Sequence, residues 1–188
     1  SGVLRVCYLD GNYPLSFFNA KGELVGFDID MAHSLAERLS LELEFVPLKR
    51  LKEEAAERLD SGYCDAVFNS LALDLNRIEI AAHTEPFSTL TAAFLVLDHQ
   101  RDDFATWEAI RRQGKITVAT SAFQPVPRDI WTRLPDADFV RLSSMEEQAR
   151  FFRSGGKGAD AFLDAAEEGA AWTVLYPRFT AVVPRPVM

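Results

Sequence analysis

The sequence has few cysteines: Cys7 and Cys64 are the two among 188 residues. No further Cys or His stands at ligand spacing from either residue, so no metal site is expected. Each lies in or beside an apolar run, "LRVCYL" and "YCDAVF", and free cysteines are among the most buried residue types. The pattern favours two buried thiols, with a disulfide as the alternative.

The chain also lacks an excess of positive charge, because 20 Lys and Arg stand against 28 Asp and Glu, a formal net charge of −8. Nucleic-acid binding relies on Lys and Arg that neutralise phosphates, so no nucleic-acid partner is expected. No polybasic run points to a membrane surface. No apolar stretch reaches the roughly 18 residues of a spanning helix, and no signal peptide is visible. A cleaved signal or an excised membrane anchor stays open.

Several catalytic motifs are absent as well. The sequence contains no H-E-x-x-H, G-x-S-x-G or G-x-G-x-x-G pattern, and its three histidines are scattered. These motifs are typical of zinc peptidases, serine hydrolases and dinucleotide-binding proteins. We therefore expect no cofactor and no metal.

Strand-like runs alternate with helical patterns along the whole chain. "LRVCYL" and "LELEFVPL" read as strands. One amphipathic helical pattern follows the strand-like "LVGF", and another follows "LELEFVPL". Such alternation predicts βαβ units and mostly parallel sheets flanked by helices, an α/β fold. We predict two lobes, residues 1–90 and 91–183, with residues 184–188 starting a second crossing to the first lobe. Ligands of such folds bind beyond the carboxyl ends of strands, which here predicts a cleft between the lobes.

The stretch "GELVGFDIDMAHSLAERL", residues 22–39, places two aspartates where a strand meets a helix. Asp28 fits a helix N-cap, and Asp30 lies in the first turn, where negative charge suits the helix dipole. This structural explanation is sufficient, so we expect neither aspartate to be catalytic.

The stretch "NSLALDLNR", residues 69–77, carries the strongest functional signal. If Asp74 caps a helix, Arg77 lies in its first turn, where the dipole disfavours a cation. An anion bound there by the guanidinium and the helix N-terminus would explain the position. The alternative is a surface arginine paired with Glu79 or another acid.

The chain resembles the family 3 bacterial solute-binding proteins, the polar amino-acid receptors of ABC transporters. The resemblance rests on "NYPLSFFNAKGELVGFDIDMAHSLAERL", "LDSGYCDAVFNSLALDLNR", "TEPF", "GKITVAT" and "GADAFLD", in the order of the family. It implies a two-lobed, type II periplasmic receptor that closes over an amino acid or small carboxylate and delivers it to a membrane transporter. It also implies an extracytoplasmic location and a protein that is not an enzyme.

Residue by residue, the resemblance implies contacts from the first lobe. Tyr13, with Phe17, falls at the aromatic wall over the ligand; the alternative is a tyrosine packed in the core. Ser70 and Ala72 fall where the family offers backbone and hydroxyl contacts, although alanine lacks the hydroxyl. Arg77 falls on the arginine that binds the α-carboxylate.

The second lobe matches less closely. The loop after "KITVAT" reads "TSAFQPVP" without glycine, which leaves Thr120 and Ser121 as donors. The position of the family's ammonium-binding acid is Ala165, with Asp164 one residue before it and Glu167 two after. Either acid could supply the carboxylate, or the ammonium contact is missing. An acidic first helical turn is the structural alternative for both.

Three further hypotheses remain. "DDFATWEAIRRQG" resembles solute-binding domains fused to dicarboxylate symporter-type membrane proteins. A sensory domain of a membrane signalling protein would share the fold, and so would a dehydratase related to cyclohexadienyl dehydratase, with Asp164 and Glu167 as acid–base candidates.

Family members continue past the second crossing, so we also expect a homodimer that covers the open first lobe. A monodisperse monomer in light scattering would count against it.

Overall fold

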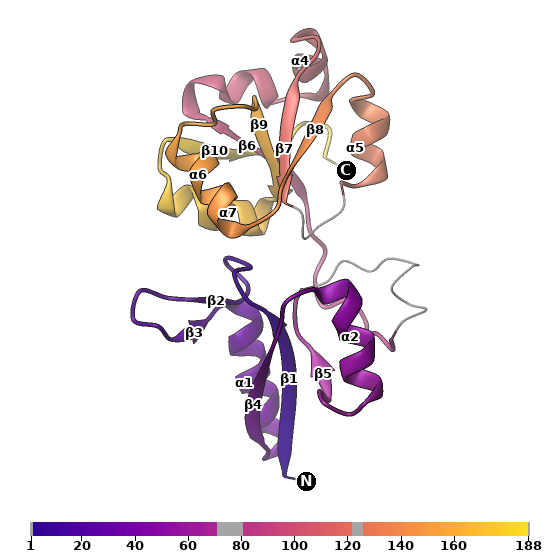
Figure 1. The fold of residues 1–188 in the computed structure, drawn as a ribbon. Helices are drawn as coiled ribbons and strands as arrows, with labels where there is room; N and C mark the ends of the chain where they lie inside the picture. Colours follow the sequence, from indigo (N-terminus) through magenta and orange to yellow (C-terminus); the bar gives the residue numbers. More distant parts are fainter. Residues whose placement is uncertain (1, 71–80, 122–125, 188) are drawn as a thin grey trace. The chain divides into compact units, whose positions relative to one another are not determined.

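The computed structural model describes residues 2–70, 81–121 and 126–187. The chain divides into two compact units, residues 1–87 and 88–188 (Figure 1). Each unit has a sheet covered by helices, so the predicted α/β class is confirmed.

In unit 1, a parallel sheet has the order β4-β1-β5, and β2 and β3 form a short hairpin beside it. The elements are β1 (Val3–Leu9), β2 (Phe17–Phe18), β3 (Leu24–Val25), α1 (Phe27–Leu39), β4 (Glu42–Leu48), α2 (Leu51–Asp60) and β5 (Ala66–Val67).

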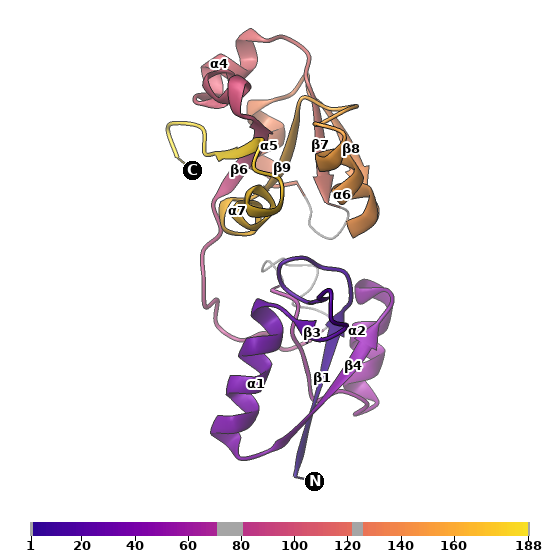
Figure 2. The ribbon, with the colours of Figure 1, turned by 90° about the vertical axis from the view of Figure 1, so that its left-hand side faces the viewer.

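Helices α1 and α2 cover opposite faces of the sheet of unit 1 (Figure 2). Successive strand residues point to opposite faces. Accordingly, Leu4 and Val6 of β1 pack with Ala32 of α1, whereas Cys7 packs on the other side with Leu59 of α2. Burial on both faces explains why β1 reads as an almost continuous apolar run.

Cys7 and Cys64 form a disulfide, so the prediction of two buried thiols is wrong. The two Cα atoms are 5.7 Å apart, and the side chains are 0% and 2% exposed. The cause is strand pairing: β5 lies beside β1 in the register Val6↔Ala66, which brings Cys64, two residues before β5, within reach of Cys7. A separation of 57 residues concealed this contact in the sequence.

Unit 2 contains a five-stranded sheet of order β10-β6-β9-β7-β8. Strands β7, β8 and β9 are parallel, whereas β6 runs antiparallel to both β9 and β10, so this sheet is mixed. The elements are β6 (Ala92–Leu97), η1 (Asp98–Phe104), α4 (Trp107–Arg112), β7 (Thr117–Ser121), α5 (Arg128–Arg133), β8 (Asp138–Leu142), α6 (Met145–Arg153), β9 (Ala161–Ala165), α7 (Ala166–Leu175) and β10 (Phe179–Val182).

The sheet of unit 2 is packed on both faces. One face meets η1, α4 and α5 through an apolar cluster that includes Phe94, Phe104 and Ile130. The other meets α6 and α7 through aromatic rings, with Phe152 and Trp172 stacked at a centroid distance of 4.9 Å. The C-terminal segment joins this unit, because Trp107 Nε1 donates to the Pro186 carbonyl over 3.0 Å.

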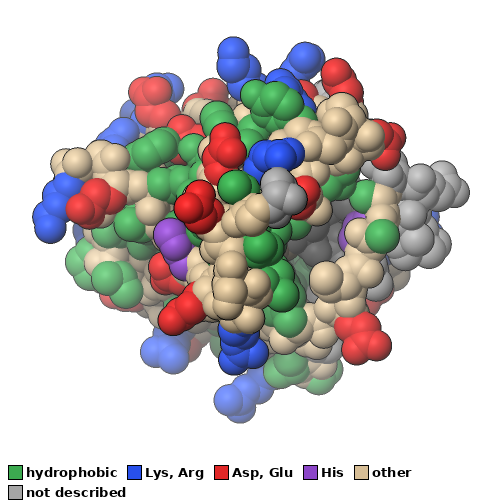
Figure 3. Space-filling model, turned by 90° about the horizontal axis from the view of Figure 1, so that it is seen from below, with side chains coloured by type: hydrophobic (Ala, Val, Ile, Leu, Met, Phe, Trp, Pro, Cys, Tyr) green, Lys and Arg blue, Asp and Glu red, His purple; other side chains and the backbone are tan. Residues whose placement is uncertain are grey.

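On the face in Figure 3, acidic and basic side chains are interspersed with hydrophobic ones. Among the described residues, no helix is both long enough and apolar enough to cross a bilayer.

Candidate functional site

The N-cap of helix α1 is Gly26, so the prediction that Asp28 is its N-cap is wrong. The N–H groups of Phe27 and Asp28 donate to the carbonyls of Pro14 and Leu15, over 3.2 and 3.0 Å. Gly26 has φ 134°, and a Cβ there would lie 2.2 Å from the Leu15 carbonyl oxygen. Glycine is therefore required, and the loop after β1 is fastened directly to the start of α1.

The Asp28 carboxylate reaches across unit 1 to the end of β5. Its Oδ1 accepts a hydrogen bond of 2.5 Å from Ser70 Oγ, and the residue is 1% exposed. Burial raises the pKa of Asp28 to about 6, and the Ser70 hydrogen bond partly opposes this shift. Ser70 itself has φ 40°, in the left-handed region that residues with a Cβ disfavour.

Tyr13 and Phe17 lie together in the loop and hairpin that follow β1. Their ring centroids are 4.9 Å apart with an interplanar angle of 69°, and both residues are partly exposed. The same loop contacts the end of β5, because Asn12 Nδ2 donates to Asn69 Oδ1 over 3.3 Å. The aromatic pair and Ser70 therefore belong to neighbouring segments at the carboxyl ends of β1 and β5.

Two predicted site residues, Ala72 and Arg77, lie outside the described residues.

In unit 2, Thr120 and Ser121 end strand β7. Thr120 is 3% exposed, and its Oγ1 has no hydrogen-bond partner within the described chain. Ser121 Oγ accepts a hydrogen bond of 3.2 Å from Nε2 of the buried Gln148 of α6. A buried hydroxyl without a partner is unfavourable, so Thr120 retains capacity for a further polar contact.

The two candidate acids of unit 2 have different surroundings. Asp164 lies in β9, partly buried, and its Oδ1 accepts from the Ala165 N–H over 2.9 Å. Its pKa is raised well above the usual value by burial first and by the neighbouring Glu168 second. Glu167 is exposed, and its Oε2 accepts from the Thr91 N–H over 3.2 Å.

Sequence reasoning missed Asn12, Asn69, Gln148 and Glu168. The hydrogen-bonded pair Asn12 and Asn69 is separated by 57 positions in the sequence, and the pair Gln148 and Ser121 by 27. No local sequence pattern reveals such contacts. Glu168 was visible as a second acid in the first turn of α7, four positions after Asp164.

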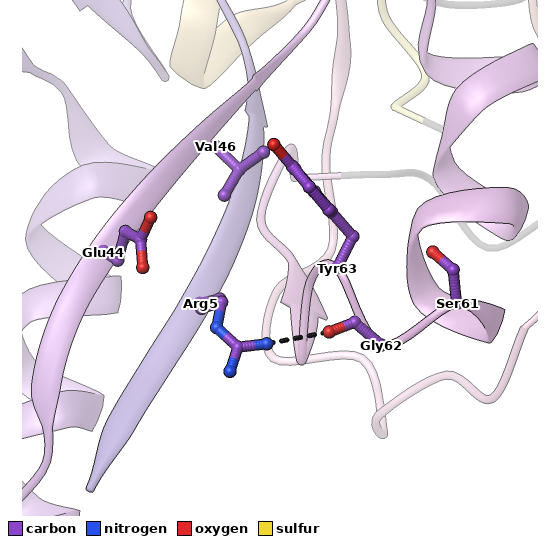
Figure 4. A pocket seen from close by; sticks show the side chains of 6 residues that line it. All are labelled: Arg5, Glu44, Val46, Ser61, Gly62 and Tyr63. Atoms are coloured by element: carbon purple, nitrogen blue, oxygen red, sulfur yellow. Dashed lines mark hydrogen bonds between the residues drawn. The ribbon is translucent and has the colours of Figure 1, made fainter. Parts of the chain in front are cut away.

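A separate hollow of about 300 Å³ lies on unit 1, lined by Arg5, Glu44, Val46, Ser61, Gly62 and Tyr63 (Figure 4). Arg5 Nη1 donates to the Gly62 carbonyl over 2.8 Å. This hollow shares no residue with the predicted site. Among the described residues, no group of three His, Cys, Asp or Glu side chains is arranged to hold a metal ion.

Polar side chains lie at strand ends in both units, where α/β proteins bind their ligands. Comparison with known sequences identifies the family of the chain. The chain belongs to the bacterial extracellular solute-binding proteins, family 3, whose model matches residues 4–172. Cyclohexadienyl dehydratase of Pseudomonas aeruginosa is 26% identical over 189 residues, 98% of this chain and 67% of that protein. The histidine-binding periplasmic protein of Salmonella typhimurium is 38% identical over 74 residues, 38% of this chain and 27% of that protein.

Solved structures give the same class. The crystal structure of an ancestral amino acid-binding protein, a precursor of cyclohexadienyl dehydratase, superposes with a TM-score of 0.77 and 26% identity. The match covers 96% of this chain and 77% of that one. The predicted type II periplasmic-binding-protein fold is thereby confirmed.

The prediction that the chain is not an enzyme is contradicted by these relatives. The dehydratase matches over nearly the whole chain, and the ancestral structure is a precursor of that enzyme. The physical reason is that one fold and similar side chains serve both tasks. A buried carboxyl group can bind an ammonium or protonate a leaving group, and its residue type does not distinguish the two roles.

Proposed function

We propose that this chain binds an amino acid or a small carboxylate outside the cytoplasm and delivers it to a membrane transporter. The observation that carries the proposal is the arrangement at the strand ends. Tyr13, Phe17 and Ser70 lie at one end of unit 1, and in unit 2 the buried hydroxyl of Thr120 has no hydrogen-bond partner among the described residues. Family membership makes solute binding the expected use of these groups.

In this proposal each group has one task. Arg77 binds the ligand carboxylate through its guanidinium, with Ser70 and the backbone at Ala72 as further contacts. The rings of Tyr13 and Phe17 pack against the apolar part of the ligand. Thr120 and Ser121 supply polar contacts, and Asp164 is the acid for an ammonium group, because Glu167 is engaged with the Thr91 N–H.

The proposed location has a second support in the Cys7–Cys64 bond. Disulfides persist in oxidising compartments such as the bacterial periplasm and are rare in the cytosol. A delivery role requires a membrane partner, and the alternative partner is a membrane signalling protein that senses the same ligand.

A thermal-shift panel tests the proposed function. L-arginine, L-histidine, L-glutamine, L-glutamate and succinate would be added separately to the folded chain. Binding at one hundred times the dissociation constant stabilises the folded state by about 2.7 kcal/mol and raises the melting temperature. A dose-dependent rise with one class of compound supports the proposal and names the class. The absence of any rise up to millimolar concentrations contradicts it.

A second candidate function is dehydration of a cyclohexadienyl acid, favoured by the raised pKa of Asp164 beside Glu168. A carboxyl group that stays protonated can give its proton to a departing hydroxyl group, while loss of carbon dioxide supplies the electron pair that completes the aromatic ring. Incubation with prephenate tests this by the appearance of an aromatic product. We expect Asp164→Asn to abolish turnover and the exposed-site control Asp129→Asn to retain it. Absence of turnover in the wild type would exclude this candidate.

A further inference from the structure

The environment of Asp28 does not suit a residue kept for stability alone. The side chain is 1% exposed, it is not at the N-cap of α1, and its Oδ2 has no hydrogen-bond partner among the described residues. Burying a carboxylate with one oxygen unpaired is unfavourable. Because Gly26 already starts the helix, the capping role requires no acid at position 28. The carboxylate therefore calls for another explanation.

The conformation of Ser70 provides a reason for the buried Asp28, because this conformation is unfavourable and needs a partner that holds it. Its φ of 40° lies in the left-handed region, where a Cβ crowds the following carbonyl oxygen. Such a conformation persists only where the surroundings hold it. Here the hydroxyl donates to Asp28 Oδ1 over 2.5 Å, so a side chain of α1, 42 positions away, holds Ser70 three residues after the end of β5.

The residue before Ser70 is held in the same manner. Asn69 is 5% exposed, and its Oδ1 accepts from Asn12 Nδ2. Two consecutive residues at the end of β5 are thus each fixed by a side chain from a different segment, Asn12 from the loop after β1 and Asp28 from α1. Fixing the chain at this point sets the direction of the main-chain groups of Asn69 and Ser70.

The hydrogen bond also limits what the Ser70 side chain can offer. A serine hydroxyl has one proton, and the Ser70 proton points to Asp28. It is therefore not available as a donor to a ligand oxygen. A contact between Ser70 and a carboxylate would have to use the main chain, whose direction the left-handed conformation sets.

We propose that Asp28 is a positioning residue for ligand binding, which holds Ser70 in its left-handed conformation so that the main-chain groups of Ser70 face the ligand. The inference rests on the proposed function, because it takes Ser70 as a ligand contact. Asp28 does not touch the ligand. It acts through Ser70, and the effect of the Ser70 hydroxyl on binding is conformational.

Four variants separate this role from a direct contact, with Asp30→Ala on the exposed side of the same helix as the control. Calorimetric titrations with L-arginine, L-histidine and L-glutamine provide the affinities, at a temperature where circular dichroism shows each variant folded. Glycine adopts positive φ without penalty, so Ser70→Gly should bind within about threefold of the wild type, whereas Ser70→Ala should bind about tenfold more weakly.

The Asp28 variants complete the test. Asp28→Ala removes the acceptor and should weaken binding about tenfold, whereas Asp28→Asn keeps an acceptor oxygen and should remain within about threefold. In the Ser70→Gly background, Asp28→Ala should have no further effect, because both act through one contact. The proposal is overturned if Ser70→Gly is as weak as Ser70→Ala, or if Asp28→Ala binds as tightly as the wild type. If Asp28→Ala does not fold, the two Ser70 variants decide.

A measurement without ligand distinguishes failure of this inference from failure of the proposed function. Burial and the Ser70 bond are the causes of the Asp28 pKa shift, with no contribution from a charged neighbour in the described chain. In NMR titrations of the side-chain carboxyl carbon, Ser70→Ala should raise the pKa of Asp28, because the bond it removes lowers it. An unchanged pKa contradicts the contact itself. A changed pKa in a protein that binds none of the three amino acids preserves the contact and overturns its role in binding.

Discussion

At the residue scale, Asp28 shows where sequence reasoning reaches its limit. Its position before an amphipathic helix predicts a cap, and the acidic first turn was read correctly. Its actual partner, Ser70, is 42 positions away. A local pattern contains no information on such a partner, whereas the neighbouring acids Asp164 and Glu168 are close enough in sequence to have been paired. The predicted contacts that involve Ala72 and Arg77 stay predictions.

The Asp28 pKa gives a prediction for stability against pH. The pKa is about 6 in the folded chain and about 3.9 when unfolded. Between these values the folded state binds more protons, so the contribution of Asp28 to stability falls as the pH rises from about 4 to about 6. Relative to Asp28→Asn, the wild type should lose about 2–3 kcal/mol of unfolding free energy over this window.

Urea denaturation of both proteins at pH 4.5 and pH 7.5 measures this difference, and Asp30→Asn serves as the control for a change of charge alone. A constant difference between wild type and Asp28→Asn at the two pH values would show that the carboxyl group is not perturbed in the folded state.

At the scale of elements, strand and helix alternation was predictable because each element has its own periodicity. The helix start at Ser144 was also predictable, since a serine cap and the residues that follow it are adjacent, and Ser144 Oγ accepts from the Glu147 N–H over 3.2 Å. The start of α1 was not, because glycine is required at position 26 by the nearby carbonyl of Leu15 in another segment. The disulfide was missed for the same reason: the pairing of β1 with β5 creates it.

The disulfide gives a prediction at this scale. It closes a segment of 57 residues between β1 and the start of β5, and closing a loop of this length in the unfolded chain is worth about 4 kcal/mol in the chain-entropy model. The double variant Cys7→Ala/Cys64→Ala should lower the unfolding free energy by about 2–4 kcal/mol. Chemical denaturation measures this loss. Two reactive thiols in the denatured, unreduced wild type would show that the bond does not form.

At the scale of the whole molecule, the family was predictable from the order of motifs along the chain, and residues 4–172 match it. The distinction between binding and catalysis was not. The relatives include a histidine-binding protein and a dehydratase, and a shared fold does not separate the two activities. Asp164 is the residue that we propose for a test of this distinction, because burial and Glu168 raise its pKa.

The central claim is that the chain binds a carboxylate-bearing solute through Arg77. The most direct measurement is a calorimetric titration of wild type and Arg77→Ala with the amino acid that gives the largest thermal shift, with Arg111→Ala as the control for loss of an exposed arginine. Losing a charge-assisted bidentate contact is worth about 1.5–3 kcal/mol, so Arg77→Ala should bind roughly ten- to one-hundredfold more weakly, and Arg111→Ala should match the wild type. Equal affinities of all three proteins would contradict the claim.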